Sequence, residues 1–169
     1  GKSPEMGQDC YIAENATIVG DVQMGNQCSV WFNAVIRGDV HYIKIGNKVN
    51  IQDGAIIHCT YQKHPTVIGN NVIIQPGTVV GSDAFYYNTK KDREHWYKKM
   101  PSCGRVIIED DVEIGACCTI DRGVSHDTVI GSGTKMDNHI HVGHDSVIGK
   151  NCLIAAHVAI AGVVDIKDG

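Results

Sequence analysis

Aliphatic residues recur at every sixth position along most of this chain. The longest uninterrupted run consists of Ile130, Met136, Val142, Ile148, Ile154, Ile160 and Ile166. Four residues after most aliphatic positions stands a small or β-branched residue, and glycine, asparagine or aspartate usually falls between the two. This hexapeptide period is typical of a parallel β-helix, in which each hexad contributes one short strand and one turn.

Three hexads of this kind make one triangular coil of about 18 residues. The aliphatic side chain points into the prism, and glycine or asparagine occupies turns whose backbone is strained for other residues. The chain holds roughly 21 hexads, or about seven coils, and each coil buries the apolar face of the next. The sequence therefore predicts an all-β fold, a single-stranded parallel β-helix that forms one domain over residues 1–169. A β-sandwich would instead show strict alternation and hairpin turns.

Four segments interrupt the six-residue period. Three short ones, within 41–44, 61–67 and 124–129, are expected to leave the coil at its corners. The long segment 86–105 is too polar for the interior, so we expect it to project as a loop. Its cations either hold an anionic substrate or partner or belong to a solvated flap; they are Lys90, Lys91, Arg93, Lys98 and Lys99.

Residues at equivalent positions three hexads apart lie above one another in such a coil. The hexads that share one face begin at Ile36, Ile57, Val80, Ile120, Val142 and Ile160. On this face Arg37 is expected beneath His58, with Gly81 above the histidine.

Further along the same face, Arg122 is expected beneath His144, with Gly162 above it. His139 and His157 are expected to stack on a different face. The period therefore separates histidines that are close in the sequence.

His139, His141 and His144 lie within six residues, and we expect His141 at a turn. The three side chains are not expected to converge within one chain. A metal ion at these histidines would need further ligands from a neighbouring chain.

The composition narrows the possible functions. A net charge of -4 and an isoelectric point near 6.1 argue against nucleic-acid or membrane-surface binding. The sequence shows neither a long apolar run nor a charged and then apolar leader, so we expect no membrane span and no signal peptide. Seven cysteines without CxxC spacing indicate reduced thiols in a cytoplasmic protein.

Residues 7–72 contain the stretches ATIVGDV, SVWFNAVIRGDVHYIKIGNKVNIQDGAIIH and TVIGNNV, which resemble the γ-class carbonic anhydrases. That family is a homotrimeric left-handed β-helix that hydrates CO2 at zinc, or another divalent ion, held by three histidines from two subunits. The resemblance implies that His58 is the first metal ligand. It also implies that Arg37 and Asp39 form an ion pair and that Gln52 lies beside the bound water.

The rest of the anhydrase motif, GHxxxxHG, does not follow. The chain reads IIQPGTVVG instead, and Pro76 and Gly81 stand where the other two histidines belong. One imidazole does not hold zinc as three do, so we expect the anhydrase chemistry to be lost and no cofactor to be required. Zinc held by His58 together with histidines of other chains is the alternative.

Residues 73–169 contain PGTVVGSDAFYY, GRVIIEDDVEIGACCTIDRG, DTVIGSGTKMDN and HVGHDSVIG. These stretches resemble the UDP-3-O-acylglucosamine N-acyltransferases of lipid A synthesis, which implies acyl carrier protein and a UDP-sugar as partners. The resemblance implies that His144 is the catalytic base and that the amide of Gly162 is the oxyanion donor. Acyl transfer to an amine needs both groups. The alternative is that His144 is an exposed histidine outside any site.

The two resemblances meet within 68–74 at matching phase, which favours a chimera, natural or engineered. The uridine-binding domain, second histidine and C-terminal helices of the acyltransferase family are not expected in this chain. The leading hypothesis is a homotrimeric acyltransferase-type protein with weak or no activity. The alternatives are a γ-carbonic-anhydrase-like metal-binding protein with a dismantled zinc site and an engineered trimeric β-helix scaffold without turnover.

Overall fold

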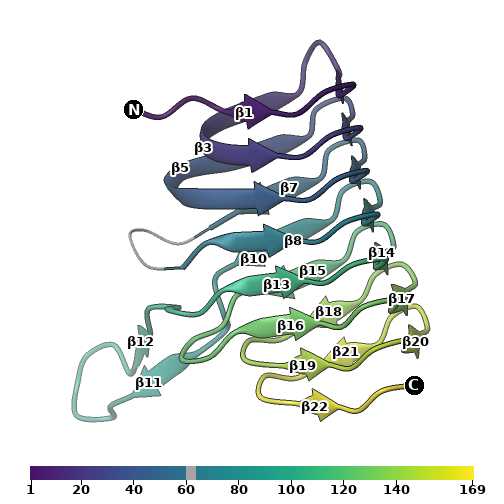
Figure 1. The fold of residues 1–169 in the computed structure, drawn as a ribbon. Coiled ribbons are helices and arrows are strands. Elements are labelled where there is room, and N and C mark those ends of the chain that lie inside the picture. The colour runs from purple at the N-terminus through teal and green to yellow at the C-terminus, as the bar shows by residue number, and fades with distance from the viewer. Residues whose placement is uncertain (60–63) are drawn as a thin grey trace.

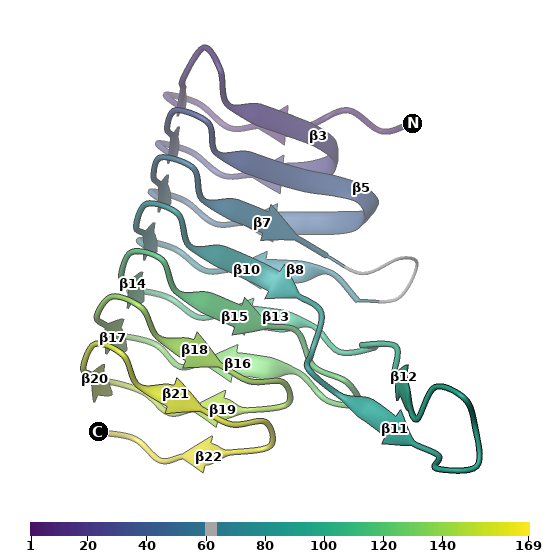
Figure 2. The ribbon, with the colours of Figure 1, turned by 180° about the vertical axis from the view of Figure 1, so that it is seen from behind.

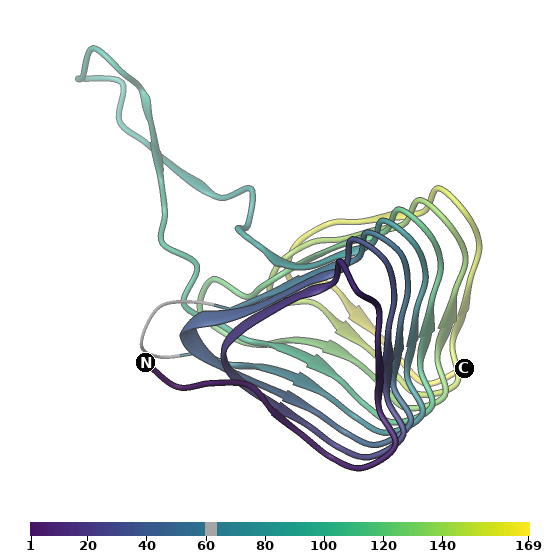
Figure 3. The same cartoon turned by 90° about the horizontal axis from the view of Figure 1, so that it is seen from above.

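The computed structural model describes residues 1–59 and 64–169, which coil into a parallel β-helix of triangular cross-section (Figures 1, 2 and 3). The N-terminus and the C-terminus lie at opposite ends of the prism (Figure 1). The fold matches the left-handed β-helix that the hexapeptide period predicts. No helix that could span a membrane occurs in the described part of the chain.

The prism has three faces, numbered in the order in which the chain visits them. Face 1 is a seven-stranded parallel sheet, in line with the expected number of coils. Its strands are β2 (Tyr11–Ile12), β4 (Ser29–Val30), β6 (Asn50–Ile51), β9 (Ile73–Ile74), β14 (Glu113–Ile114), β17 (Lys135–Met136) and β20 (Leu153–Ile154).

Faces 2 and 3 belong to one larger sheet, because two long strands bend around the corner between them. These strands are β3 (Thr17–Met24) and β5 (Val35–Ile45). Face 2 continues with β7 (Ile56–His58), β10 (Val79–Ser82), β15 (Thr119–Asp121), β18 (His141–Val142) and β21 (Ala159–Ile160). Face 3 contains β1 (Glu5–Met6), β8 (Thr66–Ile68), β13 (Val106–Ile108), β16 (Thr128–Ile130), β19 (Val147–Ile148) and β22 (Asp165–Ile166).

The predicted stacking of face 2 is confirmed. The six aliphatic residues predicted to share this face are neighbours in register from coil to coil: Ile36, Ile57, Val80, Ile120, Val142 and Ile160. All six are buried in the core. A side chain of this size contributes about 1.5–3 kcal/mol when it is removed from water. Each coil therefore holds the next through a column of aliphatic contacts.

The interruptions of the period fall at the corner between faces 2 and 3. In the pairing of β3 with β5, Gly20 lies opposite Gly38 and Val22 lies opposite Ile43. The extra residues of segment 41–44 are therefore accommodated at the corner, as predicted. Segment 124–129 joins β15 to β16 at the same corner. Of segment 61–67, residues 61–63 lie outside the described residues.

Segment 86–105 projects from the prism, as predicted (Figure 3). It is more ordered than the expected loop, since β11 (Tyr87–Thr89) and β12 (Tyr97–Lys99) pair in an antiparallel hairpin. The ion pair of Asp83 with Lys99 Nζ, at 3.1 Å, fixes the base of the hairpin. At the end of the segment, Arg105 Nη2 lies 2.6 Å from Asp127 Oδ2. We call residues 85–101 the hairpin.

Candidate functional site

His144 lies at the corner between faces 2 and 3, in the turn that follows β18. Its Nδ1 lies 2.8 Å from Oδ2 of Asp145, and the two side chains are only 12% and 4% exposed. A carboxylate can only accept, so Nδ1 carries the proton that is shared with Asp145. In the neutral ring Nε2 is then the unprotonated nitrogen and is available as a base.

Asp145 joins this histidine to the previous coil. Its Oδ1 accepts hydrogen bonds from the amides of Val124, Ser125 and His126, at 2.9, 3.0 and 2.7 Å. Burial alone would raise the pKa of Asp145, but the hydrogen bonds from His144 and from the amides of His126 and Ser125 lower it below its ordinary value. Asp145 is therefore held as a carboxylate, which orients the imidazole.

Gly162 packs directly on the His144 ring, as the period predicted. A Cβ at position 162 would lie 2.5 Å from Nε2 and 2.8 Å from two ring carbons of His144. In the described part of the chain the amide nitrogen of Gly162 donates no hydrogen bond. The backbone of the next coil thus brings a free N–H close to the basic nitrogen. Only glycine leaves room for this approach.

The hairpin reaches this corner through Tyr86. The ring of Tyr86 meets the ring of His144 edge-on, with centroids 5.3 Å apart. Arg122 turns away from His144, because its guanidinium binds the carbonyl of Gly81 at 3.0 Å and the carboxylate of Asp83. His144 is thus contacted by the coil before it, the coil after it and the hairpin.

A second polar cluster surrounds His58, at the same corner but on earlier coils. The prediction that Arg37 lies beneath His58 is confirmed, since the two residues are in register between β5 and β7. Arg37 Nη2 lies 2.8 Å from His58 Nε2, and Arg37 Nε lies 3.4 Å from Asp39 Oδ1. Burial lowers the pKa of His58, and the cations of Arg37 and Arg122 lower it further.

The residues around His58 do not fit a zinc ion. A guanidinium only donates, so His58 Nε2 accepts from Arg37, and the lone pair that would bind a metal faces a cation. Asp39 Oδ1 is 3.9 Å from this nitrogen. Among residues 1–59 and 64–169, no group of three or more histidine, cysteine, aspartate or glutamate side chains is arranged to hold a metal.

The other anhydrase-like positions are not brought to His58 as ligands. Gln52 follows β6 at the end of face 1, six residues and one corner before His58. Gly81 lies directly above His58, as predicted, and a Cβ there would be 2.2 Å from the His58 carbonyl oxygen. The backbone of Pro76 accepts a hydrogen bond from the amide of Cys117 in the next coil.

The remaining histidines of the histidine-rich stretch point elsewhere. His139 and His157 stack as predicted, with centroids 5.0 Å apart and an angle of 2° between the rings. The prediction that His141 lies at a turn is wrong, because His141 begins β18 and its Nδ1 lies 2.8 Å from Thr119 Oγ1. The residue before each inward aliphatic residue is the outward half of a strand. His141 therefore belongs to the sheet.

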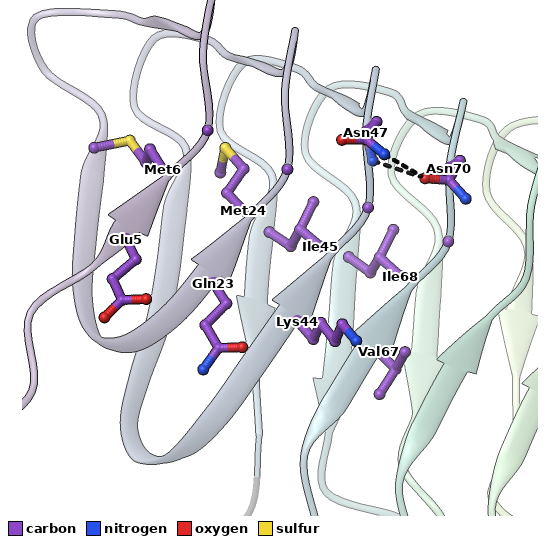
Figure 4. A pocket seen from close by; sticks show the side chains of 14 residues that line it. Glu5, Met6, Gln23, Met24, Lys44, Ile45, Asn47, Val67, Ile68 and Asn70 are labelled. Atoms are coloured by element: carbon purple, nitrogen blue, oxygen red, sulfur yellow. Dashed lines mark hydrogen bonds between the residues drawn. The ribbon is translucent and has the colours of Figure 1, made fainter.

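A shallow hollow of about 650 Å³ lies on face 3 of the N-terminal coils, between β1, β3, β5 and β8 (Figure 4). Its lining mixes Met24, Ile45 and Ile68 with Glu5 and Lys44. The hollow contains no histidine and no nucleophile, and His144 lies on later coils. It therefore adds no group to the site at His144.

Comparison with known proteins connects this geometry to a chemistry. The sequence profile of the bacterial transferase hexapeptide (six repeats) family matches residues 3–38. UDP-3-O-acylglucosamine N-acyltransferase of Methylorubrum populi is 48% identical over 102 residues, which are 60% of this chain and 28% of that protein. The enzyme of the same name from Rhodopseudomonas palustris is 50% identical over 96 residues, 57% of this chain and 26% of that protein.

The chain is similar to hexapeptide-repeat acyltransferases. It spans about a quarter of the length of the curated relatives that it matches. The crystal structure of a UDP-N-acetylglucosamine acyltransferase from Arabidopsis superposes with a TM-score of 0.83 at 24% identity, over 99% of this chain and 55% of that one. At this identity the superposition shows the fold. The resemblance of residues 7–72 to γ-carbonic anhydrases stays a prediction.

Sequence reasoning found His144 and Gly162 but missed their neighbours. Asp145 follows His144 directly, so the dipeptide itself was a signal for an oriented imidazole. Tyr86 carried no such signal, because its contact with His144 depends on the path of the hairpin.

Proposed function

We propose that this chain carries an acyl-transfer site in which His144 is the general base and the amide of Gly162 stabilises the oxyanion. The observation that supports this most directly is the packing of Gly162 on an imidazole whose Nδ1 is anchored to Asp145. The similarity to N-acyltransferases suggests the partners. They are an acyl thioester on acyl carrier protein as donor and the amine of a UDP-linked amino sugar as acceptor.

The chemistry follows from these groups. The amine attacks the thioester carbonyl and forms the new C–N bond, while His144 Nε2 takes the proton that the nitrogen loses. Negative charge develops on the carbonyl oxygen, where the Gly162 N–H donates to it. The intermediate collapses as the C–S bond breaks, and the imidazolium returns its proton to the leaving thiolate. Asp145 stabilises the imidazolium between the two steps.

The division of the chain near residue 72 is part of the proposal. The acyltransferase match takes in 102 of the 169 residues and leaves 67 outside it, close to the length of the anhydrase-like segment 7–72. The coils pair without interruption across this point, from Ile51 to Ile74 and from Ile74 to Ile114. A chimera of two β-helices is consistent with this continuity. Such a chain lacks most of the substrate-binding parts of its relatives, so we expect weak turnover.

The test is acyl transfer under single-turnover conditions, from an acyl carrier protein thioester to a UDP-linked amino sugar, in three variants. We expect His144→Gln to lower the rate by about 10²–10⁴-fold. Gly162→Ala places a methyl group against Nε2 and the oxyanion position, and should lower the rate by about 10²–10³-fold.

Gly149→Ala is the matched control. A Cβ at position 149 would lie 2.5 Å from the amide of Asp168, so this variant introduces a similar clash away from His144. It should lose stability but keep its rate at temperatures where it is folded. Equal rates for the wild type and His144→Gln would reject the proposed function.

A further inference from the structure

The base of the hairpin forms an aromatic pocket. Phe85, Tyr86, Tyr87, Thr89 and Tyr97 line a cavity of about 510 Å³. The ring of Tyr87 packs edge-on against both Phe85 and Tyr97, with centroids 5.2 and 6.5 Å apart. Four of the five lining side chains are aromatic, so the pocket presents an apolar wall with few hydrogen-bonding groups.

The aromatic pocket adjoins the proposed catalytic base. Tyr86 lines the pocket and its ring also contacts the ring of His144, at 5.3 Å between centroids. A molecule whose reacting carbonyl lies at His144 Nε2 therefore has this apolar cavity immediately beside it. Phe85 and Tyr97 are 83% and 66% exposed, which leaves a large apolar surface for a ligand to cover.

The other side of the hairpin has the opposite chemistry. Asn88, Lys90, Arg93 and Lys98 line a separate cavity of about 390 Å³. Strand side chains alternate between the two sides of the ribbon, so Tyr87 and Tyr97 fall on one side and Asn88 and Lys98 on the other. The hairpin thus separates an aromatic side from a cationic side, and only the aromatic side contacts His144.

We propose that the aromatic pocket binds the hydrocarbon chain of the acyl group, and that the site is therefore selective for long-chain over acetyl donors. The pocket volume falls within the range of small-molecule sites, which are mostly apolar with few polar groups. The identity of the donor as an acyl thioester rests on the proposed function.

The expected effect is a dependence of affinity on chain length. Each buried methylene favours binding, so the dissociation constant should fall by about tenfold for every two methylenes until the pocket is full. Acetyl, octanoyl and dodecanoyl thioesters of N-acetylcysteamine, measured by calorimetric titration of the whole chain, give this slope without any turnover.

Two variants remove the pocket and one controls for the hairpin. Phe85→Ser and Tyr97→Ser change exposed side chains, so both variants should fold, and both should flatten the dependence on chain length. Lys98→Ser lies on the cationic side, opposite Asn88 in the ribbon, and should leave the slope unchanged. Tyr86 is left intact because it contacts His144.

An affinity for the wild type that does not depend on chain length would overturn the proposal. A steep dependence that persists in both Phe85→Ser and Tyr97→Ser would also overturn it, because the chain would then bind elsewhere. His144→Gln should keep the wild-type slope. A preserved slope without acyl transfer would reject the proposed function while leaving the aromatic pocket as the hydrocarbon site.

Discussion

At the scale of single residues, Asp145 carries the most connections in the site. It accepts from His144 with one oxygen and from three backbone amides with the other. Its backbone has a φ of 57°, a conformation that asparagine and aspartate adopt more readily than most residues. Asp145→Asn therefore keeps the backbone and removes only the charge, which makes it a clean test of the carboxylate.

Asp145→Asn should weaken both catalysis and stability. The amide can present an N–H to Nδ1 of His144, which would move the ring proton to Nε2 and remove the base. We expect the rate of acyl transfer to fall by about 10²–10⁴-fold. Loss of charge-assisted hydrogen bonds at a buried group should lower the free energy of unfolding by about 1.5–3 kcal/mol at neutral pH.

The difference in stability should depend on pH with a defined sign. The folded pKa of Asp145 is lowered, so its contribution is fully present above the unfolded value of about 3.9. The contribution is lost as the pH falls through the lower folded value. Urea unfolding of both proteins, from neutral pH to below pH 4, should show the two stabilities converge. A gap that widens on acidification would contradict a carboxylate held in its charged form.

The six-residue period was enough to predict some of the residue pairs in the site. It placed Gly162 over His144 and Arg37 beneath His58, because residues three hexads apart must stack in a triangular coil. It could not predict that Arg37 would donate to His58, or that Arg122 would turn to Asp83, because side-chain direction at a corner depends on neighbours. The period also gave no information on Tyr86, which lies where the repeat is interrupted.

At the scale of elements, the hairpin is an addition to a coil that does not depend on it. The coils on either side pair directly, with Ile68 next to Ile108 on face 3 and Val80 next to Ile120 on face 2. Its strands were not predicted, because a two-stranded ribbon has no hexapeptide period. By contrast, the short strands of the prism follow directly from that period, apart from the misplaced outward residue His141.

Replacing residues 87–99 with a short glycine–serine linker should leave the prism intact. Closing a loop of different length changes the stability by only about 0.6 kcal/mol for each doubling of length. Thermal unfolding followed by circular dichroism should therefore remain cooperative, with a midpoint close to that of the wild type. The variant should lose the dependence of affinity on acyl-chain length.

Ile108→Ala shows what damage to the prism looks like in the same assay. Ile108 is buried in β13, and truncation of such a side chain lowers the free energy of unfolding by about 2–5 kcal/mol. If the hairpin variant unfolded as early as Ile108→Ala, the hairpin would be part of the core and not an addition to it.

At the scale of the whole molecule, face 3 carries an uncovered column of aliphatic side chains. Val67, Ile107, Val129 and Val147 follow one another in register along its outward side. The first three are partly exposed and Val147 is 41% exposed. A continuous apolar column on a flat sheet is typical of a surface that another protein covers. Because face 3 meets face 2 at His144, a neighbour on this face would also border the site.

We expect this column to pack against neighbouring copies in a closed trimer, the assembly implied by both resemblances. Sedimentation equilibrium at micromolar concentration should give about 55 kDa, three times the mass of one chain, since symmetric closure leaves no interface unpaired. Val129→Asp with Val147→Asp places charges in the column and should shift the protein to its 18.3 kDa monomer. Leu153→Asp is the control, because Leu153 is 85% exposed but lies on face 1. A wild-type protein that sediments as a monomer would refute the trimer, and dissociation by Leu153→Asp alone would move the interface from face 3 to face 1.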